Sequence, residues 1–278
     1  MNDKKKEPLF HIVKRDALPW YQSVGIRAIA IVLALIVCAV VTMILTGTNP
    51  IQVFQSIIAG AFGSARKTWI TFQNIAILLL ISLALTPAFK MKFWNIGGEG
   101  QVLIGGLASA ACMICLAENL PAALVVVCMI VTSIAAGAFW AFVPAFFKAK
   151  WNTNETLSTL MMNYIATQLV AFFTIVWEVP KGSGKIGIIN QNSNVGWLPQ
   201  AFGSKYLLSI LVAVLITVFM YIYLKYSKHG YEISVVGESE NTAKYVGIKV
   251  EKVIMRTMAL SGAVCGLVGL LLVGGINH

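Results

Sequence analysis

The sequence predicts an all-α, polytopic transmembrane helical bundle of about seven spans. Of its 278 residues, 58% are hydrophobic and 12% are charged, whereas soluble domains carry about 25% charged residues. Seven apolar runs are long enough to cross a hydrocarbon core of about 30 Å, which needs around 20 helical residues. The five cysteines all lie in these runs, where free cysteine packs as a small hydrophobe. No second pair or histidine accompanies Cys112-x-x-Cys115, so no metal site is expected.

The first apolar run follows a basic N-terminal segment, residues 1–25, which contains Lys4, Lys5 and Lys6. The run extends for about twenty residues without an Ala-x-Ala cleavage signal, so it is a retained first span and not a secretory peptide. The transmembrane domain is then 26–278. Its predicted spans are 26–47, 68–89, 99–117, 121–147, 157–177, 206–224 and 257–275.

The basic residues predict the orientation of these spans. With the N-terminus in the cytoplasm, all but five of the 21 lysines and arginines lie on the inner side, as the positive-inside rule requires. They flank the apolar runs and form no single basic face, which argues against a nucleic-acid partner. The five on the outer side are Arg66, Lys67, Lys181, Lys185 and Lys205.

Two outer connections have features of their own. Residues 48–67 resemble a short surface helix with a break at Gly60–Gly63, and residues 178–205 form a long connection rich in Gly, Asn and Ser. Within the latter, Lys181–Lys185 is similar to part of a phosphate-binding loop. The match fails, because Val179 stands at the first glycine position and Ile186 replaces the required Ser or Thr.

The inner connection, 225–256, contains a short predicted helix. Ser239 is a suitable N-cap, Glu240 lies in the first turn, and Gly247 is a suitable stop. A helix of about two turns is not stable alone. It is therefore held either by the protein's own membrane-facing surface or by a cytoplasmic partner.

The stretch Trp94–Gln101 combines three glycines with Asn95, Glu99 and Gln101 between two apolar runs. Polar groups among membrane helices usually face protein, water or substrate, and irregular backbone is tolerated there only where it is buried or lines a cavity. Two interpretations remain open. The stretch lines a solute path, or it is a tight interfacial turn with Glu99 in water.

The fifth apolar run carries a polar stripe. Thr156, Thr159, Asn163 and Thr167 follow one another at steps of three and four, which places them on one helix face. Such a stripe serves either interhelical hydrogen bonding or a substrate path.

The last run instead has a stripe of small residues, Gly262, Gly266 and Gly269, which predicts close helix packing. Apart from Glu99, the spans contain no acidic residue. Carriers coupled to protons or sodium commonly keep intramembrane carboxylates or histidines. The energy source is therefore expected outside this chain.

Three segments together resemble one protein family. They are Phe93–Gln101 (FWNIGGEGQ), Lys148–Ala166 with its Asn154-Glu155-Thr156 and Met161-Met-Asn-Tyr-Ile-Ala, and Gly237–Ile248 followed by Ser261-Gly-Ala. These segments resemble the permease subunits of bacterial ABC importers of nucleosides and simple sugars, relatives of the ribose permease. Members of that family usually continue for further helices, so either this chain is a fragment or its last helices are missing.

The resemblance implies a plasma-membrane transport subunit that is not itself an enzyme. Its partners would be a cytoplasmic ABC ATPase that binds ATP and Mg²⁺, a second permease that makes a homo- or heterodimer, an extracytoplasmic substrate-binding lipoprotein, and membrane lipid. The inner helix would be the coupling helix that seats in the ATPase. Its coupling residues would be Glu238, Glu240, Asn241, Ala243, Tyr245 and Gly247.

The cargo is expected to be neutral, with nucleosides first and ribose or galactose as the alternative. An ion-gradient carrier that titrates Glu99, and a membrane enzyme or scaffold, are the rival hypotheses. For a nucleoside, amide and hydroxyl groups would bind ribose or base, and aromatic rings would offer apolar faces. The candidate path residues are Asn95, Glu99, Gln101, Thr159, Asn163 and Phe172, beside Phe93 and Trp94.

Overall fold

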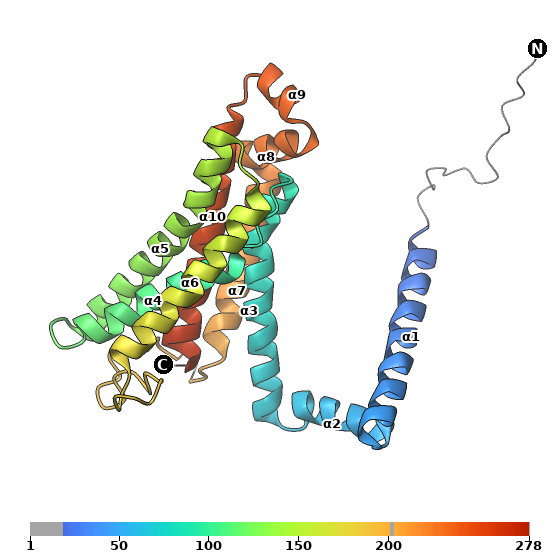
Figure 1. Cartoon of the computed structure of the whole chain (residues 1–278), viewed down its shortest axis with the longest axis vertical. Helices are drawn as coiled ribbons and strands as arrows, with labels where there is room; N and C mark the ends of the chain where they lie inside the picture. The colour runs from blue at the N-terminus through green and yellow to red at the C-terminus, as the bar shows by residue number, and fades with distance from the viewer. Residues whose placement is uncertain (1–18, 201–202, 278) are drawn as a thin grey trace, which may run out of the picture. The chain divides into compact units, whose positions relative to one another are not determined.

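The computed structural model describes residues 19–200 and 203–277, and all regular structure in this part of the chain is helical (Figure 1). Among these described residues, seven helices are long and apolar enough to cross a membrane, which confirms the predicted fold class and number of spans. Most of the predicted N-terminal segment, with Lys4, Lys5 and Lys6, lies outside the described residues. The chain divides into two compact units, Met1–Lys67 and Thr68–His278.

The first unit holds α1 (Trp20–Thr46) and α2 (Pro50–Phe62). α1 is apolar on all sides, as suits a helix surrounded by lipid. α2 is the predicted surface helix: Asn49 caps it by accepting a hydrogen bond from Ile51 N at 3.0 Å, and Pro50 occupies the first helical position. The expected break at Gly60–Gly63 is confined to its last residue, because α2 continues through Gly60 and ends just before Gly63.

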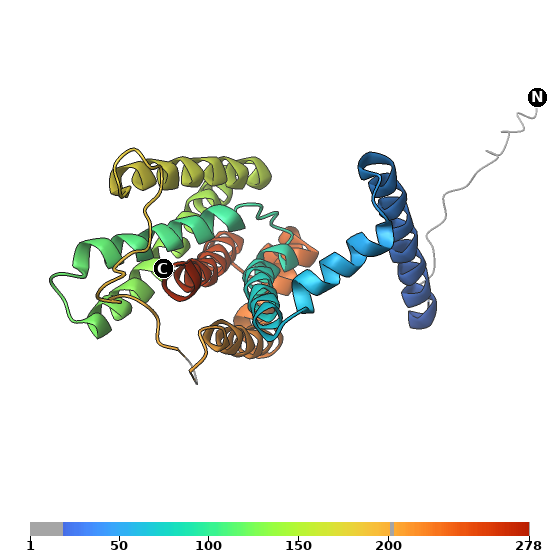
Figure 2. The same cartoon turned by 90° about the horizontal axis from the view of Figure 1, so that it is seen from below.

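The second unit is a bundle built around its last helix. In Figure 2, α10 lies between α4 and α5 on one side and α3 and α7 on the other. α10 starts at Val250 and not at the predicted 257. The prediction was late because Glu251, Lys252 and Arg256 lie in the first two turns of the helix and interrupt the apolar run. The helices are α3 (Ala65–Lys90), α4 (Gly98–Leu116), α5 (Ala122–Trp151), α6 (Glu155–Trp177), α7 (Leu207–Tyr226) and α10 (Val250–Leu270), which continues as a π-helical segment, Leu271–Asn277.

Backbone-to-backbone contacts hold α10 against α4 and α5. A Cβ atom on Gly266 would lie 2.1 Å from Ser133 O, and one on Gly262 would lie 2.2 Å from Gly137 O. A Cβ atom on Gly269 would lie 2.3 Å from Val102 O. The predicted glycine face of the last span is thus a close packing surface. The backbones can approach so closely because glycine has no side chain.

Two short helices lie at one end of this bundle, and we call it the α8–α9 end (Figure 1). α8 (Lys228–Glu238) was not predicted, whereas α9 (Glu240–Tyr245) is the predicted short helix. Ser239 caps α9 by accepting from Thr242 N at 3.2 Å, and Gly247 follows it with φ +86°. The predicted start and stop signals are confirmed.

The opposite end of the bundle carries the long connection after α6. Glu178 accepts hydrogen bonds from Gly182 N at 2.7 Å and Gly184 N at 2.8 Å, and these bonds lower the pKa of its carboxyl group. The segment that is similar to a phosphate-binding loop therefore uses its amides on a carboxylate of the same chain. Farther on, Asn190 Nδ2 donates to Met113 O at 2.7 Å and holds the connection to α4.

Candidate functional site

Candidate path residues meet at the polar turn, Phe93–Gln101, where the chain leaves α3 and enters α4. Asn95 is buried at its centre, and its Oδ1 accepts hydrogen bonds from Gly97 N at 3.0 Å and Gln101 Nε2 at 3.2 Å. Its Nδ2 donates to Ser261 Oγ of α10 at 3.4 Å. One asparagine therefore joins the turn, the start of α4 and the central helix.

The polar stripe of α6 closes the same turn from the other side. Asn163 Oδ1 accepts from Gly100 N at 2.8 Å, and its Nδ2 donates to Ile96 O at 2.9 Å. Thr159 Oγ1 lies 3.3 Å from Ile96 N and accepts its hydrogen bond. These side chains satisfy backbone groups that the interrupted helix would otherwise leave unpaired. In this conformation the stripe serves interhelical hydrogen bonding, one of the two expected uses.

Glycine is needed in the polar turn because the two helices come so close. A Cβ atom on Gly100 would lie 2.7 Å from Asn163 Oδ1, and one on Gly97 would lie 3.2 Å from Thr159 Cβ, both on α6. Larger residues would push α6 away and break the hydrogen bonds described above.

The structure thus brings together Asn95, Gln101, Thr159 and Asn163, but not the other two candidate path residues. Glu99 is exposed in the first turn of α4, and Phe172 is exposed on α6, where its ring packs on Phe173. Within the described chain, Gln101 Oε1 is buried and has no hydrogen-bond partner. It is the candidate group whose hydrogen-bonding capacity is left over inside the fold.

The predicted coupling residues lie around α9, and they divide into two kinds. Ala243 is fully buried in an apolar cluster with Ile233 and Val253, and it anchors α9 to the bundle. Tyr245 is 93% exposed. The short helix is therefore held by its own protein on one face and free on the other. The remaining predicted coupling residues, Glu238, Glu240, Asn241 and Gly247, are all exposed.

A polar cleft of about 230 Å³ lies at the base of this end. Its walls come from the residues just after α3, the end of α5, the start of α6, the joint between α8 and α9, and Ile254 of α10. Charged residues of both signs line it beside apolar ones. Its charged residues are Lys92, Lys148, Glu155, Glu238 and Glu240.

Three ion pairs among the described residues also lie at the α8–α9 end, and sequence reasoning missed all three. Lys148 Nζ lies 2.9 Å from Glu155 Oε2, and Lys150 Nζ lies 3.0 Å from Glu251 Oε2. The third pair joins the Arg256 guanidinium to the Glu232 carboxylate. The signal that could have found it was Arg256 itself, because a charge inside a membrane helix needs a partner.

Comparison with known proteins places the chain in a transport family. Residues 68–278 match the family described as branched-chain amino acid transport system / permease component. No solved structure is significantly similar to the chain.

Several curated relatives are similar over most of the chain. The guanosine ABC transporter permease protein NupP of Bacillus subtilis is 33% identical over 244 residues, which cover 87% of this chain and 69% of the relative. The nucleoside ABC transporter permease protein NupB of Lactococcus lactis is 27% identical, with 89% and 70% covered. The glucose ABC transporter permease protein TsgB13 of Haloferax volcanii is 26% identical, with 94% and 70% covered.

These matches confirm the resemblance drawn from Phe93–Gln101 and the two later segments. With its seven apolar helices and a family match across the whole second unit, the chain is a multi-pass membrane protein that belongs to the permease component family of branched-chain amino acid transport systems.

Proposed function

We propose that this chain is the membrane-spanning permease subunit of an ATP-binding cassette importer that carries nucleosides across the plasma membrane. The observation that carries the proposal is its 33% identity, along 87% of its length, to a guanosine permease. A second relative named for nucleosides supports the same class of cargo. Simple sugars are the second candidate cargo, because a glucose permease is also similar over 94% of the chain.

In this proposal the α8–α9 end faces the cytoplasm. Lys90, Lys148 and Lys150 close the ends of α3 and α5 there, and Arg256 lies near the start of α10. The connection at the opposite end contains Lys181, Lys185 and Lys205. This distribution favours the α8–α9 end as the cytoplasmic one under the positive-inside rule, which also puts the N-terminus inside.

ATP and Mg²⁺ would bind to a separate ABC ATPase, and this subunit would hydrolyse nothing. The exposed face of α9, with Tyr245 at its tip, would seat in that ATPase. Buried Ala243 supports this role, because a docking helix transmits force only if its other face is fixed to the bundle. The mixed charges around the cleft at its base suit a polar interface rim.

The solute path would run between this subunit and a second permease, identical or related. Glu99 and Phe172 face outward from the bundle, where a second subunit and the solute could reach them. Asn95, Gln101, Thr159 and Asn163 would contribute only after the polar turn opens, since their groups now bond to the fold or, like Gln101 Oε1, are buried in it. An extracytoplasmic binding lipoprotein would deliver the cargo, and lipid would surround the apolar faces.

The test is uptake by the assembled importer in proteoliposomes. The chain would be co-expressed with its ATPase, second permease and binding lipoprotein, and supplied with radiolabelled guanosine and, separately, glucose. We expect guanosine uptake that requires ATP and persists when proton and sodium gradients are collapsed. Uptake that follows an ion gradient without ATP would replace the proposal with the ion-gradient carrier.

Substituting Tyr245 and Glu240 together with alanine tests the docking surface. The double variant should fold, because both side chains are exposed, but lose ATPase association and uptake by tenfold or more, about the effect of removing an aromatic hot spot. Tyr231→Ala on the exposed face of α8 is the matched control and should retain both. Normal ATPase association and uptake in the double variant would exclude α9 as the docking site.

A further inference from the structure

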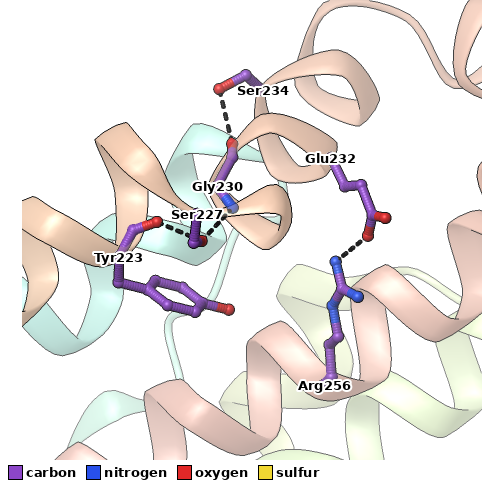
Figure 3. Close-up of polar contacts among 6 residues, drawn as sticks. All are labelled: Tyr223, Ser227, Gly230, Glu232, Ser234 and Arg256. Atoms are coloured by element: carbon purple, nitrogen blue, oxygen red, sulfur yellow. Dashed lines mark hydrogen bonds and ion pairs between the residues drawn. The ribbon is translucent and has the colours of Figure 1, made fainter.

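α8 is fixed at its start by the joint with α7. Ser227 Oγ accepts from Gly230 N at 3.0 Å and donates to Tyr223 O at 2.6 Å, and Ser234 Oγ donates to Gly230 O at 3.0 Å (Figure 3). A Cβ atom on Gly230 would lie 2.4 Å from Leu224 O. The first turn of α8 is therefore held directly against the end of α7.

The far end of α8 is packed just as closely. A Cβ atom on Gly237 would lie 2.1 Å from Lys90 O at the end of α3. Ile233 and Val236 are buried in the same cluster as Val253 and Met258 of α10. Apolar side chains bring α8 onto α10, but such contacts are non-directional and do not by themselves fix its position along that helix.

The directional contact between α8 and α10 is an ion pair. Arg256 of α10 donates to the Glu232 carboxylate of α8 (Figure 3). The two side chains are only 30% and 14% exposed, so solvent screens them less than a surface pair. Arg256 bonds to Glu232 through Nη2, while its Nε is buried and has no hydrogen-bond partner in the described part of the chain. Loss of Glu232 would leave a half-buried guanidinium without a counter-charge.

The other two described ion pairs at this end join different elements. Lys148–Glu155 connects α5 to α6, and Lys150–Glu251 connects α5 to the first turn of α10. The Glu232–Arg256 pair instead connects the short-helix segment, α8 and α9, to the central helix. α10 in turn touches α4 and α5 backbone to backbone through its glycines. A displacement of α10 must therefore move α4 and α5 with it.

We propose that the Glu232–Arg256 ion pair is the positioning contact that passes movement of the α8–α9 segment to α10, and so couples ATP hydrolysis to opening of the solute path. The inference rests on the proposed function. A charge-assisted hydrogen bond resists sliding because its strength depends on the direction of approach. Without it, α8 keeps its apolar packing and α9 keeps its exposed face, but α8 slips on α10 when α9 is moved.

The experiment measures coupling in the assembled importer in nanodiscs and proteoliposomes. The readouts are ATPase association, radiolabelled guanosine transported per ATP hydrolysed, and hydrogen exchange of the α8 backbone amides. Glu232→Gln and Arg256→Gln should keep ATPase association. Both should lower guanosine per ATP by about tenfold, the size of effect expected for one charge-assisted hydrogen bond, and should raise amide exchange in α8.

Two further variants separate positioning from simple damage. The exchanged double variant, Glu232→Arg with Arg256→Glu, restores the opposite charges and should recover most of the coupling lost in either single change. Lys150→Gln with Glu251→Gln removes the pair between α5 and α10, whose side chains are 49% and 56% exposed. It should change coupling only slightly, since exposed ion pairs contribute little.

Failure of the inference differs from failure of the proposed function. Wild-type ATP-driven guanosine uptake with full coupling in Glu232→Gln would overturn the inference alone, as would a Lys150/Glu251 variant that uncouples equally. If wild type moves no guanosine, the proposed cargo is wrong. Hydrogen exchange of the α8 amides would then still decide the inference, which fails if exchange does not rise in Glu232→Gln.

Discussion

The two ends of the bundle solve the same problem, a connection between membrane helices, in different ways. At the end opposite α8 and α9, Glu178 accepts hydrogen bonds from two amides of its own connection, and Asn190 donates both to Val195 O within that connection and to Met113 O of α4. At the α8–α9 end, polar groups instead bridge separate helices, as Glu232 and Arg256 do. The first arrangement closes a surface, and the second links elements so that one moves with another.

The largest expected effect comes from the backbone contact of α8 with α3. Gly237→Val would place side-chain atoms against Lys90 O, where even a Cβ atom would lie at 2.1 Å. We expect a loss of about 1–3 kcal/mol in the free energy of unfolding, typical of overpacking, and loss of ATPase association. Thermal unfolding of the purified protein and ATPase co-purification measure the two effects.

The opposite end supplies the matched control. Gly182 has φ +85°, but a Cβ atom added there would meet no atom within 4 Å, so Gly182→Val strains only the local backbone. It should leave ATPase association intact. Equal losses of ATPase association from the two glycine variants would contradict the distinction between the α8–α9 end, which links helices, and the opposite end.

An intermediate effect is expected at the polar turn. Asn163→Ala removes hydrogen bonds to Gly100 N, which is part-buried, and to Ile96 O, which is exposed, so the free energy of unfolding should fall by about 0.5–1.5 kcal/mol, the net contribution of a typical hydrogen bond. Thr167→Ala is the control, because Thr167 bonds only to Asn163 O of its own helix. Chemical denaturation of both variants in the same detergent compares them, and equal stabilities would remove the proposed role of the α6 stripe.

The smallest effect is expected at Glu178. Its carboxylate has a pKa below the usual 4.5 because Gly182 N and Gly184 N donate to it, so the charged form stabilises the turn. This contribution is complete above the usual pKa and is lost as the pH falls through the lower folded value. At neutral pH, Glu178→Gln should speed hydrogen exchange at Gly182 and Gly184 while uptake stays normal.

A pH series tests whether the charge of Glu178 holds the turn. Wild-type exchange at the two glycine amides, corrected for intrinsic rates, should approach that of the glutamine variant only below the usual carboxyl pKa. A wild type that matches the variant at neutral pH would show that the charge of Glu178 does not hold the turn.

Features that belong to a single helix could be predicted from the sequence. Apolar runs located seven spans, Ser239 and Gly247 located α9, and Gly262 and Gly266 marked the packing face of α10. α8 was missed because Gly230 and Gly237 lower the helix propensity of its sequence. Glycine occurs at both positions because another part of the backbone lies too close for a Cβ atom.

The rest required three dimensions. Glu232 and Arg256 are 24 residues apart, and nothing in their spacing selects one carboxylate among those of the inner connection. Asn95 and Asn163 were predicted as path residues, and their mutual arrangement around Ile96 and Gly100 depends on how α4 meets α6. Glu99, by contrast, lies at an exposed position in the first turn of α4, which both interpretations of the turn allow.

The most direct test asks which end of the bundle meets the ATPase. A photo-crosslinking amino acid would be placed at Tyr245 in one variant and at Lys185 in another, in cells that express the complete importer. We expect the crosslinker at Tyr245 to capture the ATPase and the one at Lys185 not to. Capture of the ATPase from Lys185, with none from Tyr245, would contradict a cytoplasmic α8–α9 end.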